Sequence, residues 1–150
     1  MSDFTLAPQI QNSSVSVRMI GPFELRLVDD ARYLWLLLIP HIADITELHH
    51  LPEALRHQLI DNAAIIASCM QSHTKADKMN VAAIGNIVSQ MHVHIIARHK
   101  DDDAWPDPVW GRGSPTPYEP EKRKATMTAL QSWLDGVSDR LMSPDKDYRP

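Results

Sequence analysis

The clearest alternation of polar and apolar residues along the chain runs from Gln90 to Arg98. A period of two over this length predicts a half-buried β-strand. Successive side chains of a strand point to opposite faces of the sheet, so Gln90, His92 and His94 share one face and the apolar residues between them share the other. The sequence therefore predicts a row of three polar side chains along one strand.

An earlier part of the chain predicts a β-hairpin. Residues 23–29 alternate between apolar and polar positions and lead into an Asp-Asp-Ala-Arg turn. The next run, residues 33–39, is apolar throughout and stops at Pro40, as expected for a strand that is covered on both faces. The two runs together make the hairpin.

Between this hairpin and the strand of residues 90–98 the pattern becomes helical. From Pro52 to residues 71–74, apolar residues recur at the spacing of one helix face, and proline is tolerated in the first turn. Residues 78–84 then predict a short strand, and Gly85 a turn before the strand that carries the histidines.

The two ends of the chain have their own character. Residues 1–22 carry scattered apolar positions and predict an arm that lies on the body as a short helix or an extended piece. Residues 104–120 are rich in proline and tryptophan and predict a loop, and residues 121–142 predict a C-terminal helix. We therefore expect residues 1–150 to form a single α+β domain, an antiparallel sheet with one long helix between hairpins and a C-terminal helix.

Composition and charge narrow the possible partners. The chain has 150 residues, 43% of them hydrophobic, which suffices for one ordinary core. A formal net charge of −4 gives no basic field for a nucleic-acid backbone. No apolar run reaches the roughly 18 residues of a membrane span. The only cysteine, Cys69, excludes an intramolecular disulfide and fits a reducing compartment, so we expect a cytoplasmic protein without nucleic-acid or membrane partners.

Two imidazoles on one strand face suggest chemistry at phosphorus. A neutral imidazole nitrogen is a competent nucleophile when its other nitrogen donates to a fixed acceptor. The neighbour two residues further on is spaced to give a proton to a leaving group. His92 and His94 are therefore candidates for these two roles.

The sequence Gly-Asn-Ile-Val-Ser-Gln-Met-His-Val-His-Ile-Ile-Ala-Arg of residues 85–98 resembles the signature of the histidine triad (HIT) superfamily of nucleotide hydrolases and transferases. The resemblance implies that His92 is the nucleophile toward the α-phosphate of a nucleotide conjugate and that His94 is the third histidine. Gln90 stands where the family has its first histidine, which is a departure from the pattern. The resemblance also implies the HIT fold and a homodimer.

Further residues are candidates for holding the substrate. By the same resemblance Asp29 takes the ribose hydroxyls, although an aspartate here also suits the start of a turn. Asn80 and Asn86 resemble the polar residues near the phosphate and leaving group, and Asn86 equally suits a turn beside Gly85. Arg98 contacts either a phosphate or the acidic loop that follows it.

The proline-rich loop carries two tryptophans, Trp105 and Trp110, whose large side chains we expect to be exposed. Two tryptophans in such a loop either cover the second half of the ligand or pack on a partner subunit.

The sequence favours an enzyme that acts on a nucleotide or nucleoside phosphate conjugate, without a cofactor and without a resident metal. One alternative is a non-catalytic nucleotide-binding module, in which Gln90 marks lost turnover. A second is a metal-binding pair of histidines with His99 nearby, although residues 95–99 supply no carboxylate ligand.

Overall fold

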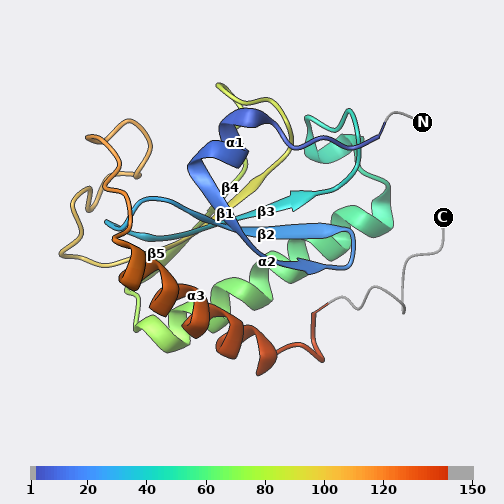
Figure 1. Ribbon diagram of the computed structural model, residues 1–150. Helices are drawn as coiled ribbons and strands as arrows, with labels where there is room; N and C mark the ends of the chain where they lie inside the picture. Colours follow the sequence, from blue (N-terminus) through green and yellow to red (C-terminus); the bar gives the residue numbers. More distant parts are fainter. Residues whose placement is uncertain (1–2, 142–150) are drawn as a thin grey trace.

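The computed structural model describes residues 3–141 (Figure 1). Its single antiparallel sheet has the strand order β1-β2-β3-β5-β4. The strands are β1 (Ser14–Ile20), β2 (Phe23–Val28), β3 (Leu34–Pro40), β4 (Lys78–Ala82) and β5 (Val93–Arg98). The helices are α1 (Pro8–Ser13), α2 (Glu53–Thr74) and α3 (Pro120–Asp135), with a short 3₁₀ turn, η1 (Leu48–His50). The predicted α+β fold with an antiparallel sheet is confirmed.

Helix α2 follows its sequence pattern closely. It buries a stripe at the predicted spacing, formed by Leu55, Leu59, Asn62, Ile66 and Met70. The helix ends where Lys75 takes a left-handed conformation with φ of 58°, a common way to stop a helix. In Figure 1, α2 and α3 lie along one side of the sheet and α1 lies on the other.

The two faces of the sheet differ in what they bury. The face toward α2 and α3 is apolar and forms the main core, with Leu25 of β2, Leu36 and Leu38 of β3 and Ile95 of β5. The other face carries the polar and aromatic side chains, among them His94, and is covered by α1 and by the loop after β5. The candidate chemistry thus lies on the face away from the long helix.

Strand β5 begins at Val93, three residues later than the alternation predicts. Val93 pairs with Leu38, so the next positions would bring Met91 opposite Pro40, which has no N–H to donate. The chain leaves the ladder there, and the N–H of Met91 donates to the carbonyl of Ile45. Strand β4 similarly ends at Ala82 and not at residue 84.

The ends of the chain also differ in part from the prediction. The arm contains both expected forms, the short helix α1 and an extended piece, but the extended piece is the edge strand β1 of the sheet. Regular helix α3 stops at Asp135, where Gly136 follows, and residues 136–141 form turns. Met142, the last residue of the predicted helix, lies outside the described residues. Within residues 3–141, no helix is both long and apolar enough to cross a membrane.

Candidate functional site

The His92 side chain is held by the backbone two residues before it. Its Nδ1 lies 2.6 Å from the carbonyl oxygen of Gln90. A carbonyl oxygen only accepts hydrogen bonds, so Nδ1 is protonated, and in the neutral ring Nε2 then keeps its lone pair. Only 9% of the residue is exposed, which keeps the ring in place. This is the tautomer that a nucleophilic imidazole needs.

His94 lies beside His92 and is more deeply buried. The two rings are 4.8 Å apart between centroids and meet edge to face. The indole N–H of Trp35, on the neighbouring strand β3, donates to Nδ1 of His94 over 3.0 Å. Burial, together with the nearby His92, lowers the pKa of His94 to about 3. His94 is therefore neutral at physiological pH.

Aromatic rings from two directions enclose His94. Trp110 meets it edge to face at 5.1 Å and meets Trp35 at 6.2 Å. Residues 104–119, which contain no helix or strand, bring Trp110 there, because Ala104 and Val109 are buried against this face of the sheet. Trp105 lies elsewhere, 5.7 Å from the guanidinium of Arg98.

Gln90 uses its two ends for different tasks. Its backbone carbonyl binds His92, whereas its side-chain amide binds the N-terminal arm. The amide oxygen accepts from the N–H of Ala7 over 2.9 Å, and the amide nitrogen donates to the carbonyl of Thr5 over 2.8 Å. The amide thus joins the arm to the segment that carries His92.

Arg98 and Asn80 come together, but with the acidic loop and not with the histidines. Arg98 is 1% exposed and forms two hydrogen bonds with Asp102, one with Asn80 Oδ1 and one with the Asp107 carbonyl. Burial raises the pKa of Asp102, but hydrogen bonds from Arg98 and from two backbone amides outweigh it and lower the pKa to about 2. These contacts match the second of the two predicted roles of Arg98.

Asp29 and Asn86 lie at loop positions. The Oδ1 atom of Asp29 accepts from the N–H of Tyr118 over 2.9 Å, at the end of β2. The pKa of Tyr118 is raised to about 12, by burial and by the nearby Asp30 and Asp29. Asn86 is solvent-exposed and follows Gly85, whose φ is +73°. The two residues thus occupy the turn positions that their alternative interpretations describe.

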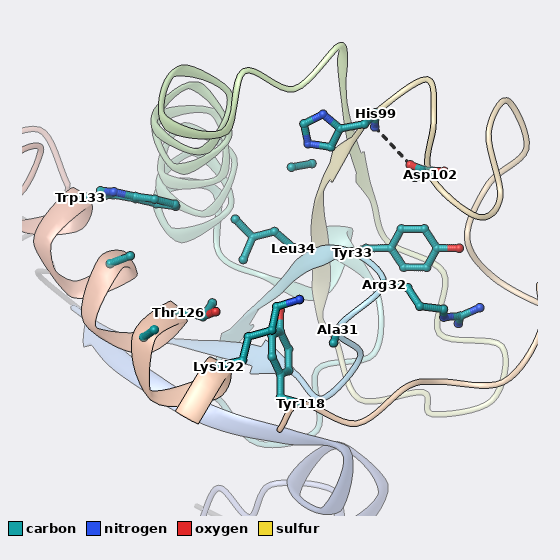
Figure 2. Close-up of a pocket in the computed structure, with 13 residues that line it drawn as sticks. Ala31, Arg32, Tyr33, Leu34, His99, Asp102, Tyr118, Lys122, Thr126 and Trp133 are labelled. Atoms are coloured by element: carbon teal, nitrogen blue, oxygen red, sulfur yellow. Dashed lines mark hydrogen bonds between the residues drawn. The ribbon is translucent and has the colours of Figure 1, made fainter. Parts of the chain in front are cut away.

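A cavity of about 400 Å³ lies on the side of the sheet that faces α3, away from His94 (Figure 2). It is bounded by α3 and by the turn between β2 and β3, and Leu34 and Ala97 belong to its lining. Because these two residues pack with the main core, this cavity is separate from His92 and His94, although His99 belongs to its lining. Among residues 3–141, no three His, Cys, Asp or Glu side chains form a group that could hold a metal ion.

The partner of His94 was missed by sequence reasoning. Trp35 and His94 are 59 residues apart and meet only through the register in which Trp35 pairs with Ile96 and Leu37 with His94. In the sequence, Trp35 is one member of an apolar run, and nothing there marks it as a hydrogen-bond donor to a histidine.

Comparison with known proteins agrees with this architecture. The HIT domain model matches residues 14–101, which include every strand of the sheet and both histidines. The sheet, the helix between the hairpins and the His-x-His strand define a HIT-type domain, and the chain belongs to the histidine triad family.

Solved structures of histidine triad proteins from three bacteria are similar over nearly the whole chain. The protein from Bradyrhizobium japonicum is 33% identical with a TM-score of 0.86, and the match covers 89% of this chain and 99% of that one. The protein from Sinorhizobium meliloti 1021 is 35% identical with a TM-score of 0.85, covering 87% and 97%. The protein from Marinobacter aquaeolei VT8 is 32% identical with a TM-score of 0.88, covering 91% and 99%. No functionally curated protein matches the chain.

Proposed function

We propose that this protein is a nucleotide-conjugate hydrolase or nucleotidyl transferase that acts at the α-phosphate through a covalent intermediate on His92. Membership of the HIT family supports a nucleotide-binding or nucleotide hydrolase or transferase function. The observation that carries the proposal is the 2.6 Å hydrogen bond from His92 Nδ1 to the Gln90 carbonyl. It leaves the lone pair on Nε2 free for attack.

The reaction has two steps. In the first, the Nε2 lone pair of His92 forms a bond to phosphorus, and the bond from phosphorus to the leaving group breaks with its electron pair on that group. The ring becomes cationic and keeps its Nδ1 proton on the Gln90 carbonyl. In the second step water attacks phosphorus, the phosphorus–nitrogen bond breaks, and the nucleoside monophosphate and a proton are released. A transferase replaces this water with an acceptor group.

Asp29 and Asn86 are the proposed substrate contacts outside the histidines. Asp29 has one oxygen on the Tyr118 amide, and a carboxylate has acceptor capacity beyond one bond, which suits the ribose hydroxyls. Asn86 is exposed on the segment that precedes His92 and is proposed to contact the leaving group. For Arg98 and Asn80 we favour support of the 102–107 loop over phosphate binding, because their polar groups already bind each other and that loop.

A homodimer is proposed through the β4 edge of the sheet. A free edge strand presents unpaired backbone groups, and exposed apolar side chains often mark an interface. Val81 on β4 is 47% exposed, and Ile84 and Ile87 just beyond it are 43% and 95% exposed. In the proposed dimer a second copy of the chain covers these three side chains. The proposed location is the cytoplasm, because Cys69 is free and buried and one cysteine fits a reducing compartment.

A non-catalytic nucleotide-binding module is the second candidate. One observation favours it: Gln90 cannot ionise, and its amide is already bound to the arm. This candidate predicts nucleotide binding without release of a nucleoside monophosphate.

The test is to trap the intermediate. The protein is mixed with a panel of nucleotide conjugates and quenched in base, where a phosphorus–nitrogen bond to histidine survives, and the peptide carrying His92 is analysed by mass spectrometry. We expect a nucleotidyl adduct on His92, and no adduct or turnover in a His92→Asn protein that still binds nucleotide. An adduct on His94, or turnover by His92→Asn, overturns the mechanism.

A further inference from the structure

We propose that Trp35 is a positioning residue that locks His94 in its neutral Nε2–H form, so that His94 donates a hydrogen bond in catalysis and does not protonate the leaving group. The tautomer itself follows from the contacts of His94. Its consequence for catalysis rests on the proposed function.

The indole of Trp35 decides which nitrogen of His94 carries the proton. An indole N–H only donates, so the Nδ1 that receives it over 3.0 Å must hold a lone pair. A neutral imidazole has one N–H, which must then be on Nε2. The two histidines of the strand are therefore opposite tautomers, since His92 carries its proton on Nδ1.

The surroundings of His94 also oppose its cationic form. The ring is 7% exposed and lies against Trp35 of β3 and Trp110 of the loop. Its partners in the ladders are Leu37 of β3 and Ala82 of β4, neither of which is charged. Of these neighbours and His92, only His92 can gain a proton near neutral pH. A protonated His92 would repel a protonated His94. A second proton on Nδ1 would also point at the indole N–H.

A locked neutral imidazole is a poor acid. If it gave its Nε2 proton to a leaving group, it would become an anion in a buried aromatic setting, which is a costly charge even beside the cationic His92 ring of the intermediate. It can still donate a hydrogen bond to an oxygen on which negative charge develops. The departing group must then carry its own charge, so the site favours conjugates whose leaving group is stable as an anion.

The tautomer can be observed without any substrate. Protein labelled with ¹⁵N-histidine is studied by long-range ¹H–¹⁵N correlation spectra between about pH 5 and 8, with His94 assigned from a His94→Gln protein. We expect a pyridine-like Nδ1 and a pyrrole-like Nε2 across the range. A protonated Nδ1, or titration of His94 near its usual range, overturns the proposal.

Two variants separate the hydrogen bond from ring packing. Trp35→Phe keeps an aromatic ring and removes the donor, so His94 should become a mixture of tautomers. Trp110→Phe is the matched control, because Trp110 also packs on His94 but the indole that donates to it is that of Trp35. It should leave the tautomer as in the wild type. An unchanged single Nε2–H tautomer in Trp35→Phe overturns the role of Trp35.

Kinetics with aryl esters of a nucleoside monophosphate test the consequence. We expect kcat/KM of the wild type to fall steeply as the pKa of the departing phenol rises. We also expect the wild type and His94→Gln to show the same dependence of kcat/KM on pH at the alkaline end, with no decline that is present in the wild type and absent from the variant. Such a decline would identify His94 as an acid and overturn its role as a pure donor. If no conjugate is turned over, the proposed function fails, while the spectra still decide the tautomer.

Discussion

Gln90 and His92 are coupled through the backbone, since the carbonyl of Gln90 accepts the Nδ1 proton of His92 over 2.6 Å. The side chain of the same glutamine binds the backbone of Thr5 and Ala7. Gln90 thus supports His92 with its main chain and the N-terminal arm with its amide. An ionisable ring is not needed for either contact.

Gln90→Glu should loosen the arm and leave the His92 contact in place. The carboxylate has the same shape and still accepts from Ala7, but it cannot donate to the Thr5 carbonyl. We expect a loss of about 1–2 kcal/mol in the free energy of unfolding, with faster amide exchange at Ala7. Denaturant unfolding and hydrogen exchange measure both effects. A variant as stable as the wild type, with Ala7 equally protected, would show that the hydrogen bonds of the Gln90 amide with the arm contribute nothing to stability.

The Arg98–Asp102 pair should make stability sensitive to acid. The pKa of Asp102 is about 2 in the folded protein, below the ordinary value of 3.8. This group therefore stabilises the fold above about pH 4, and the contribution of roughly 2 kcal/mol is lost as the pH falls toward 2. Asp102→Asn should lower the free energy of unfolding by about 3 kcal/mol at neutral pH, because it leaves buried Arg98 without its carboxylate. It should also reduce the acid limb, which is the decrease in the free energy of unfolding between about pH 4 and 2.

The neighbouring Asp101 provides the control for this experiment, because it is solvent-exposed. Asp101→Asn should unfold like the wild type in denaturant at every pH. Equal acid limbs in the Asp102→Asn and wild-type proteins would contradict the assignment of the limb to Asp102.

The sequence predicts most reliably the parts of this fold that rest on local periodicity. Helix α2 holds its apolar stripe over 22 residues, so one period dominates the pattern. Strand β1 is predicted only as part of the arm, although residues 14–19 alternate between polar and apolar side chains. A register shift between Ser16 and Arg18 means that the buried positions do not follow this alternation. The predicted strand begins too early, because the alternation starts at Gln90 whereas β5 begins at Val93.

The contacts of the candidate site also fall into two groups, those between residues near in sequence and those between distant strands. The ion pair of Arg98 with the following loop is local in sequence, four residues apart, and was one of its two predicted roles. The bond from Trp35 to His94 depends on how two distant strands pair. Sequence reasoning therefore found the histidines, whereas the group that sets the protonation of His94 required the structure.

The proposed dimer should depend on the β4 edge. Val81→Lys with Ile87→Lys places two charges on that edge, and we expect the dimer to dissociate in sedimentation velocity experiments. Met19→Lys is the control, because Met19 is similarly exposed at 48% but lies on β1, the opposite edge. A monomeric wild type would refute the dimer, and an equally dimeric double variant would refute its location.

Asp29 should discriminate ligands by their ribose hydroxyls. A 2′,3′-dideoxy nucleotide should bind the wild type more weakly, by roughly 1–3 kcal/mol, because the carboxylate loses hydrogen-bond partners. Asp29→Ala also removes the acceptor of the Tyr118 amide, so the informative quantity is the ratio of the two affinities measured by calorimetry. That ratio should approach one in the variant. The same ratio in both proteins would end the assignment of Asp29 to the ribose.

His94 should be replaceable by a neutral donor but not by an apolar ring. Glutamine can donate a hydrogen bond through its amide and cannot ionise near neutral pH, so His94→Gln should keep kcat within about tenfold of the wild type, a barrier change of ~1.4 kcal/mol. His94→Phe fills the space between Trp35 and Trp110 without a donor and should lose about a hundredfold or more, since a lost donor at a developing charge costs on the order of 3 kcal/mol. The measurement is kcat with a conjugate whose leaving group is a good one, with nucleotide binding checked for both variants. Equal losses in the two variants would mean that His94 contributes something that a neutral N–H donor cannot supply, and proton transfer would then return as its role.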